Sequence, residues 1–207
     1  MPVLITDRDL ERRLIRRRKR TGIDRWDEVW EGVYVMGALP NDEHQRVAGL
    51  LTTVLTMIIE LTGRGHVRPG VNVSDQPVRW KRNYRCPDVV VYLNGNPAEN
   101  RGTHWYGGPD LAIEIVSPGE DPHAKLDFYA KVTMHEVLII DRDPWRIELF
   151  RLTDGELTSA GVSEIAVNSP GSVLASNVVP FTWKLVPGSH RARIETTCTE
   201  TGQVWHV

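Results

Sequence analysis

The chain has 207 residues, of which 41% are hydrophobic and 25% are charged. This composition is typical of a globular protein and excludes a chain that is disordered or coiled coil throughout. No apolar run approaches the ~18 residues that a membrane helix needs, and the N-terminus lacks the apolar core of a signal peptide. The net charge of −2 gives no general attraction to nucleic acids, so affinity for phosphate must come from a local cluster of cations.

One such cluster lies near the start of the chain, where residues 6–20 have the pattern of a helix. Thr6 can cap this helix, and Gly22 lies just past its end. Its polar face carries the basic residues Arg12, Arg13, Arg16, Arg17, Arg18, Lys19 and Arg20. These cations indicate either a solvated helix end whose charges complement the helix dipole, or a patch that contacts phosphates.

The rest of the chain combines helical and strand patterns. Residues 26–36 predict two short strands that turn near Gly32, and apolar residues at helical spacing predict a long helix that opens at residues 40–42 and closes at Gly63. A second helix is predicted over 121–132, with Pro122 at its first position. Period-two patterns predict strands over 66–73, 78–82, 88–93, 111–117, 136–141 and 146–153, and a final hairpin around Thr201-Gly202.

Together these elements predict one α/β domain over residues 1–207, with a mixed central β-sheet flanked by helices and a β-rich C-terminal part. The basic helix (1–25) and the final hairpin (191–207) are expected to be appendages of that domain. The two cysteines, Cys86 and Cys198, cannot form a disulfide framework, so we expect the protein in a reducing cytoplasm.

Two carboxylates occur in predicted strands that look buried. Glu114 interrupts the apolar run 111–116, and Asp88 follows Pro87 at the start of another apolar strand. An unpaired buried carboxylate costs several kcal/mol, so each acid needs a cation, hydrogen-bond donors or a metal. If the two strands are neighbours, the acids can converge on a Mg²⁺ ion, and one of its waters can attack a phosphodiester. The alternative is that Glu114 pairs with a core arginine such as Arg85.

Lys125 follows Glu114 by eleven residues and is predicted on the next helix, near one end of the Glu114 strand. A lysine beside a metal-bound water can orient it or stabilise the charge that develops on phosphorus. The alternative is a surface pair with Asp121, four residues earlier. Tyr129, one helical turn beyond Lys125, is expected to share its face.

Glu43 and His44 lie in the first turn of the long helix. His44 leans toward the buried face, where a neutral imidazole can ligate a metal or relay a proton, although a core or capping histidine fits equally well. Glu43 suits the helix dipole in any fold. Glu31 is a candidate only if its strand crosses the same cleft. The aromatic pair Trp105-Tyr106 either stacks on a base or fills space, and space-filling is favoured.

These motifs, taken in order, resemble the Uma2 family of restriction-endonuclease-like proteins, which belongs to the PD-(D/E)XK nuclease superfamily. The resemblance covers roughly residues 26–185. It is carried by the segments Glu-Gly-Val-Tyr-Val-Met36, Pro40-Asn-Asp-Glu-His44, Pro87-Asp88-Val-Val-Val, Pro109-Asp110-Leu-Ala-Ile-Glu114-Ile-Val-Ser-Pro118, Lys125-Leu-Asp-Phe-Tyr129 and Val137-Leu-Ile-Ile-Asp141. It implies a restriction-endonuclease-like core, a mixed sheet flanked by helices with a metal bound at one end.

The resemblance also implies roles for single residues. Asp88 matches the first metal-binding acid and Glu114 the second, while His44 or Glu43 matches the acid or histidine of the first core helix. The superfamily's lysine normally stands two residues after the second acid, where this chain has Val116. As in the Uma2 family, Lys125 on the next helix is implied to take that role.

The leading hypothesis is therefore a DNA endonuclease that depends on Mg²⁺ or Mn²⁺. Asp88 and Glu114 ligate the metal, Lys125 positions the nucleophile, and His44 and Glu43 assist from the helix. A homodimer suits cleavage of both strands of DNA. A catalytically weak or inactive module on the same scaffold, which binds nucleic acid or oligomerises, is the alternative. A third hypothesis is a β-rich binding domain whose acids balance Arg82 and Arg85.

Overall fold

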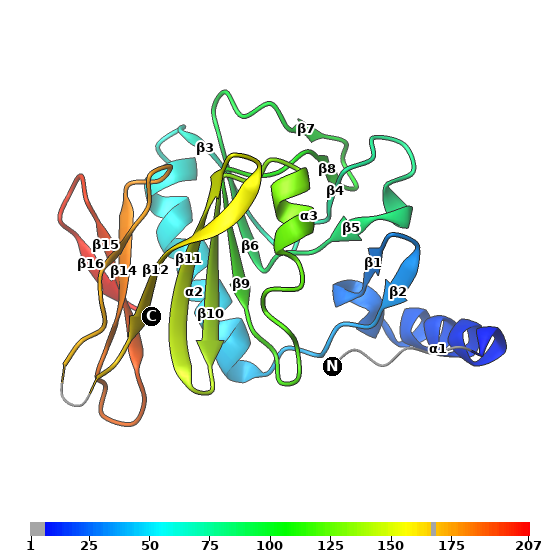
Figure 1. Cartoon of the computed structure of the whole chain (residues 1–207), viewed down its shortest axis with the longest axis horizontal. Coiled ribbons are helices and arrows are strands. Elements are labelled where there is room, and N and C mark those ends of the chain that lie inside the picture. Colours follow the sequence, from blue (N-terminus) through cyan, green and yellow to red (C-terminus); the bar gives the residue numbers. More distant parts are fainter. Residues whose placement is uncertain (1–6, 167–168) are drawn as a thin grey trace.

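The computed structural model describes residues 7–166 and 169–207 and is built around a six-stranded mixed sheet (Figure 1). The strand order is β12-β11-β10-β9-β6-β3, and β9 runs parallel to β10 while the other neighbours are antiparallel. The strands are β3 (Gly65–Pro69), β6 (Val89–Leu93), β9 (Leu111–Ile115), β10 (Glu136–Arg142), β11 (Trp145–Thr153) and β12 (Glu156–Glu164). The α/β fold with a mixed sheet that the sequence predicts is confirmed.

Helices cover both faces of this sheet (Figure 1). Helix α2 (Asp42–Leu55) continues into a π-helical segment, η2 (Thr56–Glu60), and buries its apolar stripe against one face. The short helix α3 (Leu126–Lys131) packs on the other face. Because side chains alternate along a strand, Val89 and Ile113 contact the α2 side, and Val90 and Ala112 the α3 side.

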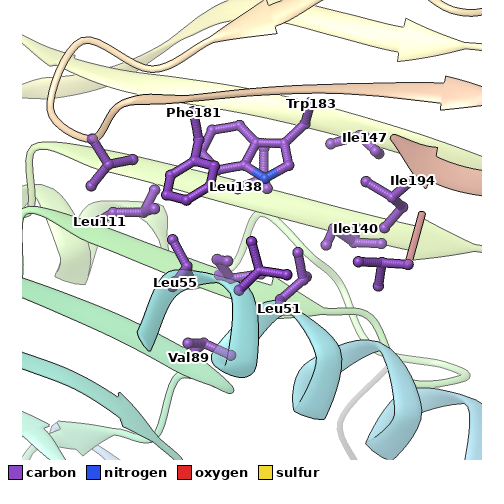
Figure 2. Packing of buried hydrophobic residues seen from close by; sticks show 14 of the residues in the cluster. Leu51, Leu55, Val89, Leu111, Leu138, Ile140, Ile147, Phe181, Trp183 and Ile194 are labelled. Atoms are coloured by element: carbon purple, nitrogen blue, oxygen red, sulfur yellow. The ribbon is translucent and has the colours of Figure 1, made fainter. Parts of the chain in front are cut away.

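A second sheet extends the core on the α2 side. Its strands are β13 (Leu174–Ala175), β14 (Phe181–Val186), β15 (Arg193–Cys198) and β16 (Val204–His206), paired in that order. The expected final hairpin is present as β15 and β16. Figure 2 shows Phe181 and Trp183 packed over Leu138 of the main sheet, in the same cluster as Leu51 and Leu55 of α2.

A third, smaller sheet closes the α3 side of the molecule. It contains β2 (Val33–Val35), β1 (Glu28–Trp30), β5 (Tyr84–Arg85), β4 (Val73–Ser74), β8 (Trp105–Tyr106) and β7 (Glu99–Asn100), in this order. Trp105 is buried and stacks on Tyr92 of β6, with ring centroids 3.8 Å apart. The favoured space-filling interpretation of the Trp105-Tyr106 segment is thus confirmed for Trp105.

The basic helix α1 (Arg8–Thr21), followed by a 3-10 turn, η1 (Ile23–Trp26), lies at the end of the molecule opposite the C-terminal sheet (Figure 1). Asp7 is its N-cap, because its carboxylate accepts from the backbone N–H groups of Asp9 and Leu10. Thr6, the expected cap, lies outside the described residues. Gly22 ends the helix with a left-handed φ of 70°, as expected.

Three predicted elements differ in the structure. The strand predicted over 66–73 is interrupted, because β3 ends at Pro69, Gly70 has a positive φ of 57°, and β4 begins only at Val73. Residues 78–82 are not a strand, because the backbone turns into a 3-10 helix, η3 (Trp80–Arg82), in which the Trp80 ring stacks on His104. The helix predicted over 121–132 begins only at Leu126. The Asp121 side chain accepts from the backbone N–H of His123, and the resulting turn occupies the expected first helical positions.

None of the helices in the described part of the chain is long and apolar enough to span a membrane.

Candidate active site

The two predicted acids lie at the same end of neighbouring strands. Strands β6 and β9 are antiparallel with Val89 opposite Ile113; Asp88 directly precedes β6, and Glu114 directly follows Ile113. The Glu114 side chain leaves the sheet on the α3 face, because Ile113 and Ile115 on either side of it pack on the α2 side. Asp88 is also tied to β9 directly, because its Oδ2 accepts from the backbone N–H of Ile115 at 2.8 Å.

Lys125 is the cation beside these acids. Its Nζ lies 3.2 Å from Oε2 and 3.3 Å from Oε1 of Glu114. It also lies 3.0 Å from Oε1 of Glu28. Lys125 is the residue just before α3, and its side chain extends to Glu114. The alternative, a surface pair with Asp121, is therefore not formed.

Glu28, a residue that the sequence interpretation missed, brings a further carboxylate to this lysine. It lies at the start of β1 and is buried. Its Oε2 accepts from Nε1 of Trp30 at 2.6 Å, and its Oε1 accepts from the backbone N–H of Cys86 at 2.8 Å. A signal was available, because strand alternation places Glu28 on the same side as Trp30, where a carboxylate is expected to need a partner.

Tyr129 completes the group from α3. Its hydroxyl donates to Oε1 of Glu114, and the ring is buried in the cluster between α3 and the sheet. The expectation that Tyr129 shares a face with Lys125 is confirmed, because both side chains contact the same carboxylate.

Burial and crowding of negative charge dominate the electrostatics of the site. Burial raises the pKa of Glu114 to about 7, against the opposing effect of Lys125, and the nearby carboxylates of Asp88 and Glu28 raise this pKa further. Burial alone would lower the pKa of Lys125, but the charges of Glu114 and Glu28 outweigh it and raise that pKa. One ammonium thus faces three carboxylates, an arrangement that favours a further cation.

His44 reaches the site from the opposite face of the sheet. It lies in the first turn of α2, and its Nε2 is 3.3 Å from Oδ2 of Asp88. Among the described residues, its buried Nδ1 has no hydrogen-bond partner. Its backbone N–H donates to the capping side chain of Asn41.

Glu43 does not join this group, contrary to the expected assistance from the helix. Its carboxylate pairs with Arg142 and Arg191 instead. Successive residues of a helix point about 100° apart, so the neighbour of an inward-pointing His44 is directed elsewhere.

Glu31 and Arg85 are also separate from the acids. Glu31 lies in the turn between β1 and β2, and its backbone N–H donates to Oδ1 of Asn83. The guanidinium of Arg85 lies between the rings of Trp30 and Phe128, 4.5 and 4.2 Å from their centroids. Because Glu114 pairs with Lys125, the alternative that Glu114 balances Arg85 is wrong.

The donor set matches what a small divalent cation needs. No group of three or more His, Cys, Asp or Glu side chains arranged to hold a metal occurs within the described ranges. Mg²⁺, however, is commonly held by one or two carboxylates and keeps several waters. Asp88 and Glu114 supply two carboxylates at the same end of β6 and β9, and the contacts of Asp88 described above all use Oδ2. These residues therefore fit such an ion.

The mixed sheet thus carries two acids and a lysine close together at one end. Residues 16–187 match the sequence model of Uma2, described as "Putative restriction endonuclease". Since the match spans most of the chain, the chain belongs to the Uma2 family, and the resemblance drawn from its motifs is confirmed. Family membership supports a nuclease function.

The fold agrees with this assignment. It is similar to a crystal structure from Anabaena variabilis ATCC 29413, described as "a putative nuclease belonging to DUF820". The similarity has a TM-score of 0.52 and 18% sequence identity, and it covers 64% of this chain and 75% of the other. No curated protein matches the sequence.

Proposed function

We propose that this protein is a DNA endonuclease that depends on Mg²⁺ or Mn²⁺. The proposal rests on one observation: Asp88 and Glu114 lie at the same end of two paired strands, and the Glu114 carboxylate is within 3.3 Å of Nζ of Lys125. Asp88 and Glu114 would hold the ion. When bound, it would supply a water of lowered pKa and positive charge for phosphodiester hydrolysis.

The other residues of the site act on the substrate or position the two acids and the lysine. The ammonium of Lys125 stabilises the negative charge that develops on the phosphate oxygens, or orients the attacking water. Glu28 and Tyr129 are positioning residues: Glu28 fixes the lysine, and Tyr129 fixes the Glu114 carboxylate. His44 holds Asp88 from the far side of the sheet and can move a proton there.

We also propose an oligomeric state, a domain organisation and a cellular location for the protein. A homodimer would place two copies of the site on opposite strands of a duplex. The whole chain, residues 1–207, would form a single domain. Free thiols at Cys86 and Cys198 fit a reducing cytoplasm.

One observation favours a second function, a weakly active or inactive module that binds nucleic acid. Lys125 is already engaged by two carboxylates, Glu28 and Glu114, and Val116 occupies the position at which the superfamily normally has its lysine. An ammonium held in this way can serve the fold rather than a substrate.

Cleavage of a supercoiled plasmid separates the two functions. We expect the wild type to nick and linearise the plasmid with Mg²⁺ or Mn²⁺ but not with EDTA. Glu114→Gln should lower the rate by about 100-fold or more, because it removes a ligand of the ion that would stabilise the developing charge. The matched control is Glu156→Gln at an exposed position of β12, which should cleave as the wild type does. Metal-independent cleavage, or full activity of Glu114→Gln, would contradict the proposal.

A further inference from the structure

The charges of this protein are distributed very unevenly. Helix α1 holds eight of the chain's 25 Lys and Arg residues but only two of its 27 Asp and Glu residues. The rest of the molecule is left with 17 basic against 25 acidic residues. Helix α1, which we call the arm, is thus strongly positive, while the rest of the molecule, which we call the body, is negative. A surface that attracts phosphate is therefore expected on the arm.

The arm is held in place by one of its own arginines. The guanidinium of Arg18 donates to both carboxylate oxygens of Asp27, with Nε 2.7 Å from Oδ2. It also donates to the backbone carbonyls of Ile23 and Gly37. The Asp27 side chain is only 1% exposed, and a buried, bidentate pair of this kind fixes geometry. Asp27 directly precedes Glu28, so α1 is anchored beside the strand that contacts Lys125.

Four other arginines form a face with no such structural role. Arg13, Arg16, Arg17 and Arg20 follow the spacing i, i+3, i+4, i+7, and together they line one hollow on the helix surface. All four are exposed, and within the described part of the chain none of them has an ion pair. We call this set the arginine face.

The fold alone gives no reason for the arginine face. Like charges at i,i+4 cost a helix about 0.2–0.5 kcal/mol per pair, and two such pairs occur here. The helix dipole favours cations only in the last turn, which holds Arg18, Lys19 and Arg20. Arg13 and Arg16 lie further back, so the dipole does not explain them. An external anionic partner does.

The apolar side of the helix argues against a membrane as that partner. Helices that lie in the membrane interface need a continuous, free apolar face. In α1, Leu14 and Ile15 are already half-buried, and only Leu10 is exposed, at 40%. The accessible groups of α1 are guanidinium groups, which bind phosphate oxygens in a bidentate geometry.

We propose that the arginine face of α1 binds the phosphate backbone of DNA outside the acidic site. It supplies affinity without reading base sequence, and it offsets the repulsion between DNA and the negative body. The inference rests on the proposed function in that it names the same substrate, but it concerns binding and needs no cleavage.

Binding of a fluorescent, random-sequence DNA duplex tests this inference. Anisotropy is measured in EDTA, where no cleavage occurs, between about 50 and 200 mM salt. The test variant is R13Q/R16Q/R17Q/R20Q. The matched control is R46Q/R64Q/R101Q/R193Q, which removes four exposed arginines outside α1 and changes the net charge equally. Circular dichroism checks that α1 remains helical, as the relief of like-charge repulsion predicts.

The arm variant should bind DNA at least about 10-fold more weakly at the lowest salt, and its salt dependence should be shallower by about 0.9 for each phosphate that is no longer neutralised. The control should keep most of the affinity and of the slope. Equal losses in both variants, or no loss in the arm variant, would overturn the inference. Tighter wild-type binding to phosphatidylserine vesicles than to DNA would also overturn it.

The same data separate the two proposals. Arm-dependent binding by a protein that never cleaves would refute the nuclease and leave the arm's role standing. Metal-dependent cleavage by a protein whose arm variant binds normally would refute the arm's role alone.

Discussion

At the scale of single residues, Glu28 is the carboxylate that reaches Lys125 from the small sheet. It is a buried carboxylate whose two oxygens accept from an indole N–H, a backbone N–H and the ammonium of Lys125. A carboxylate that is hydrogen-bonded in this way has little freedom to move. It therefore sets where the lysine head group lies relative to Glu114. Because Glu28 acts through the lysine, it is a positioning residue.

Glu28→Gln keeps the shape of the side chain and removes its charge. We expect kcat for plasmid cleavage to fall by about 10- to 100-fold, the usual cost of losing a group that orients a catalytic one. DNA affinity in EDTA should stay unchanged, because the substitution does not touch the arginine face. Glu31→Gln, three residues away in the exposed turn, is the control and should cleave normally. An equal loss of DNA affinity and kcat would show that Glu28 serves the fold alone.

Asp88 and Glu114 stood out in the sequence because each is an acid in an apolar strand pattern, whereas Lys125 was singled out by its place after the Glu114 strand and by the family resemblance. Glu28 escaped notice because its burial depends on packing of the small sheet near α3, which its alternation with Trp30 does not specify by itself. For the adjacent pair Glu43 and His44, spacing suggested that His44 turns inward, and the structure agrees. The spacing could not show whether Glu43 also contributes to the site, because its carboxylate pairs with Arg142 and Arg191 from distant parts of the chain.

At the scale of elements, the end of the α2 segment is fastened to the edge of the main sheet by one side chain. Glu60 is the last residue of η2, and its Oε2 accepts from the backbone N–H of Val67 in β3 at 3.0 Å. Arg68, also in β3, lies 2.6 Å from the same oxygen. These contacts fix the turn by which the chain passes from the helix into the sheet.

This attachment predicts a pH dependence of stability. The hydrogen bond from Arg68 lowers the pKa of Glu60 below its ordinary value of 4.5. A lowered folded-state pKa means that the stabilisation is present above pH 4.5 and is lost as the pH falls further. Glu60→Gln should therefore lower the unfolding free energy at neutral pH, and its difference from wild type should shrink in acid. Urea denaturation at several pH values measures this. A difference that stays constant into the acid range would contradict the account, and the exposed Glu156→Gln is the control.

The longer elements were the more predictable ones. The apolar stripe of α2 and the strands of the main sheet repeat their pattern often enough to specify the type of element. Two short segments did not follow propensity. A side-chain turn at Asp121 delays α3, and stacking of Trp80 on His104 turns the expected strand 78–82 into η3.

At the scale of the whole molecule, the C-terminal sheet helps to bury the main sheet. Trp183 of β14 is fully buried in the cluster that contains Leu138 and the apolar stripe of α2 (Figure 2). Its indole Nε1 has no hydrogen-bond partner among the described residues, so its contribution to stability comes from packing.

Trp183→Ala should therefore destabilise the protein by about 3–5 kcal/mol, the range for removing a large buried aromatic side chain. Trp183→Phe should cost much less, because it keeps most of the apolar volume and removes an unpaired N–H group. Chemical denaturation of both variants measures the difference. A small effect of the alanine variant would show that this sheet contributes little to the main core.

We propose that Asp88 and Glu114 of this molecule jointly bind a divalent cation at the end of the main sheet. The most direct measurement is the thermal unfolding midpoint of wild type and Asp88→Ala as Mn²⁺ is added. A ligand at about 100 times its Kd stabilises the folded state by about 2.7 kcal/mol, and each kcal/mol raises the midpoint by about 2–4 °C in a protein of this size. We expect this rise in the wild type and in an exposed control, Asp9→Ala, and no rise in Asp88→Ala. An equal response of the wild type and Asp88→Ala, or no response in either, would contradict the proposal.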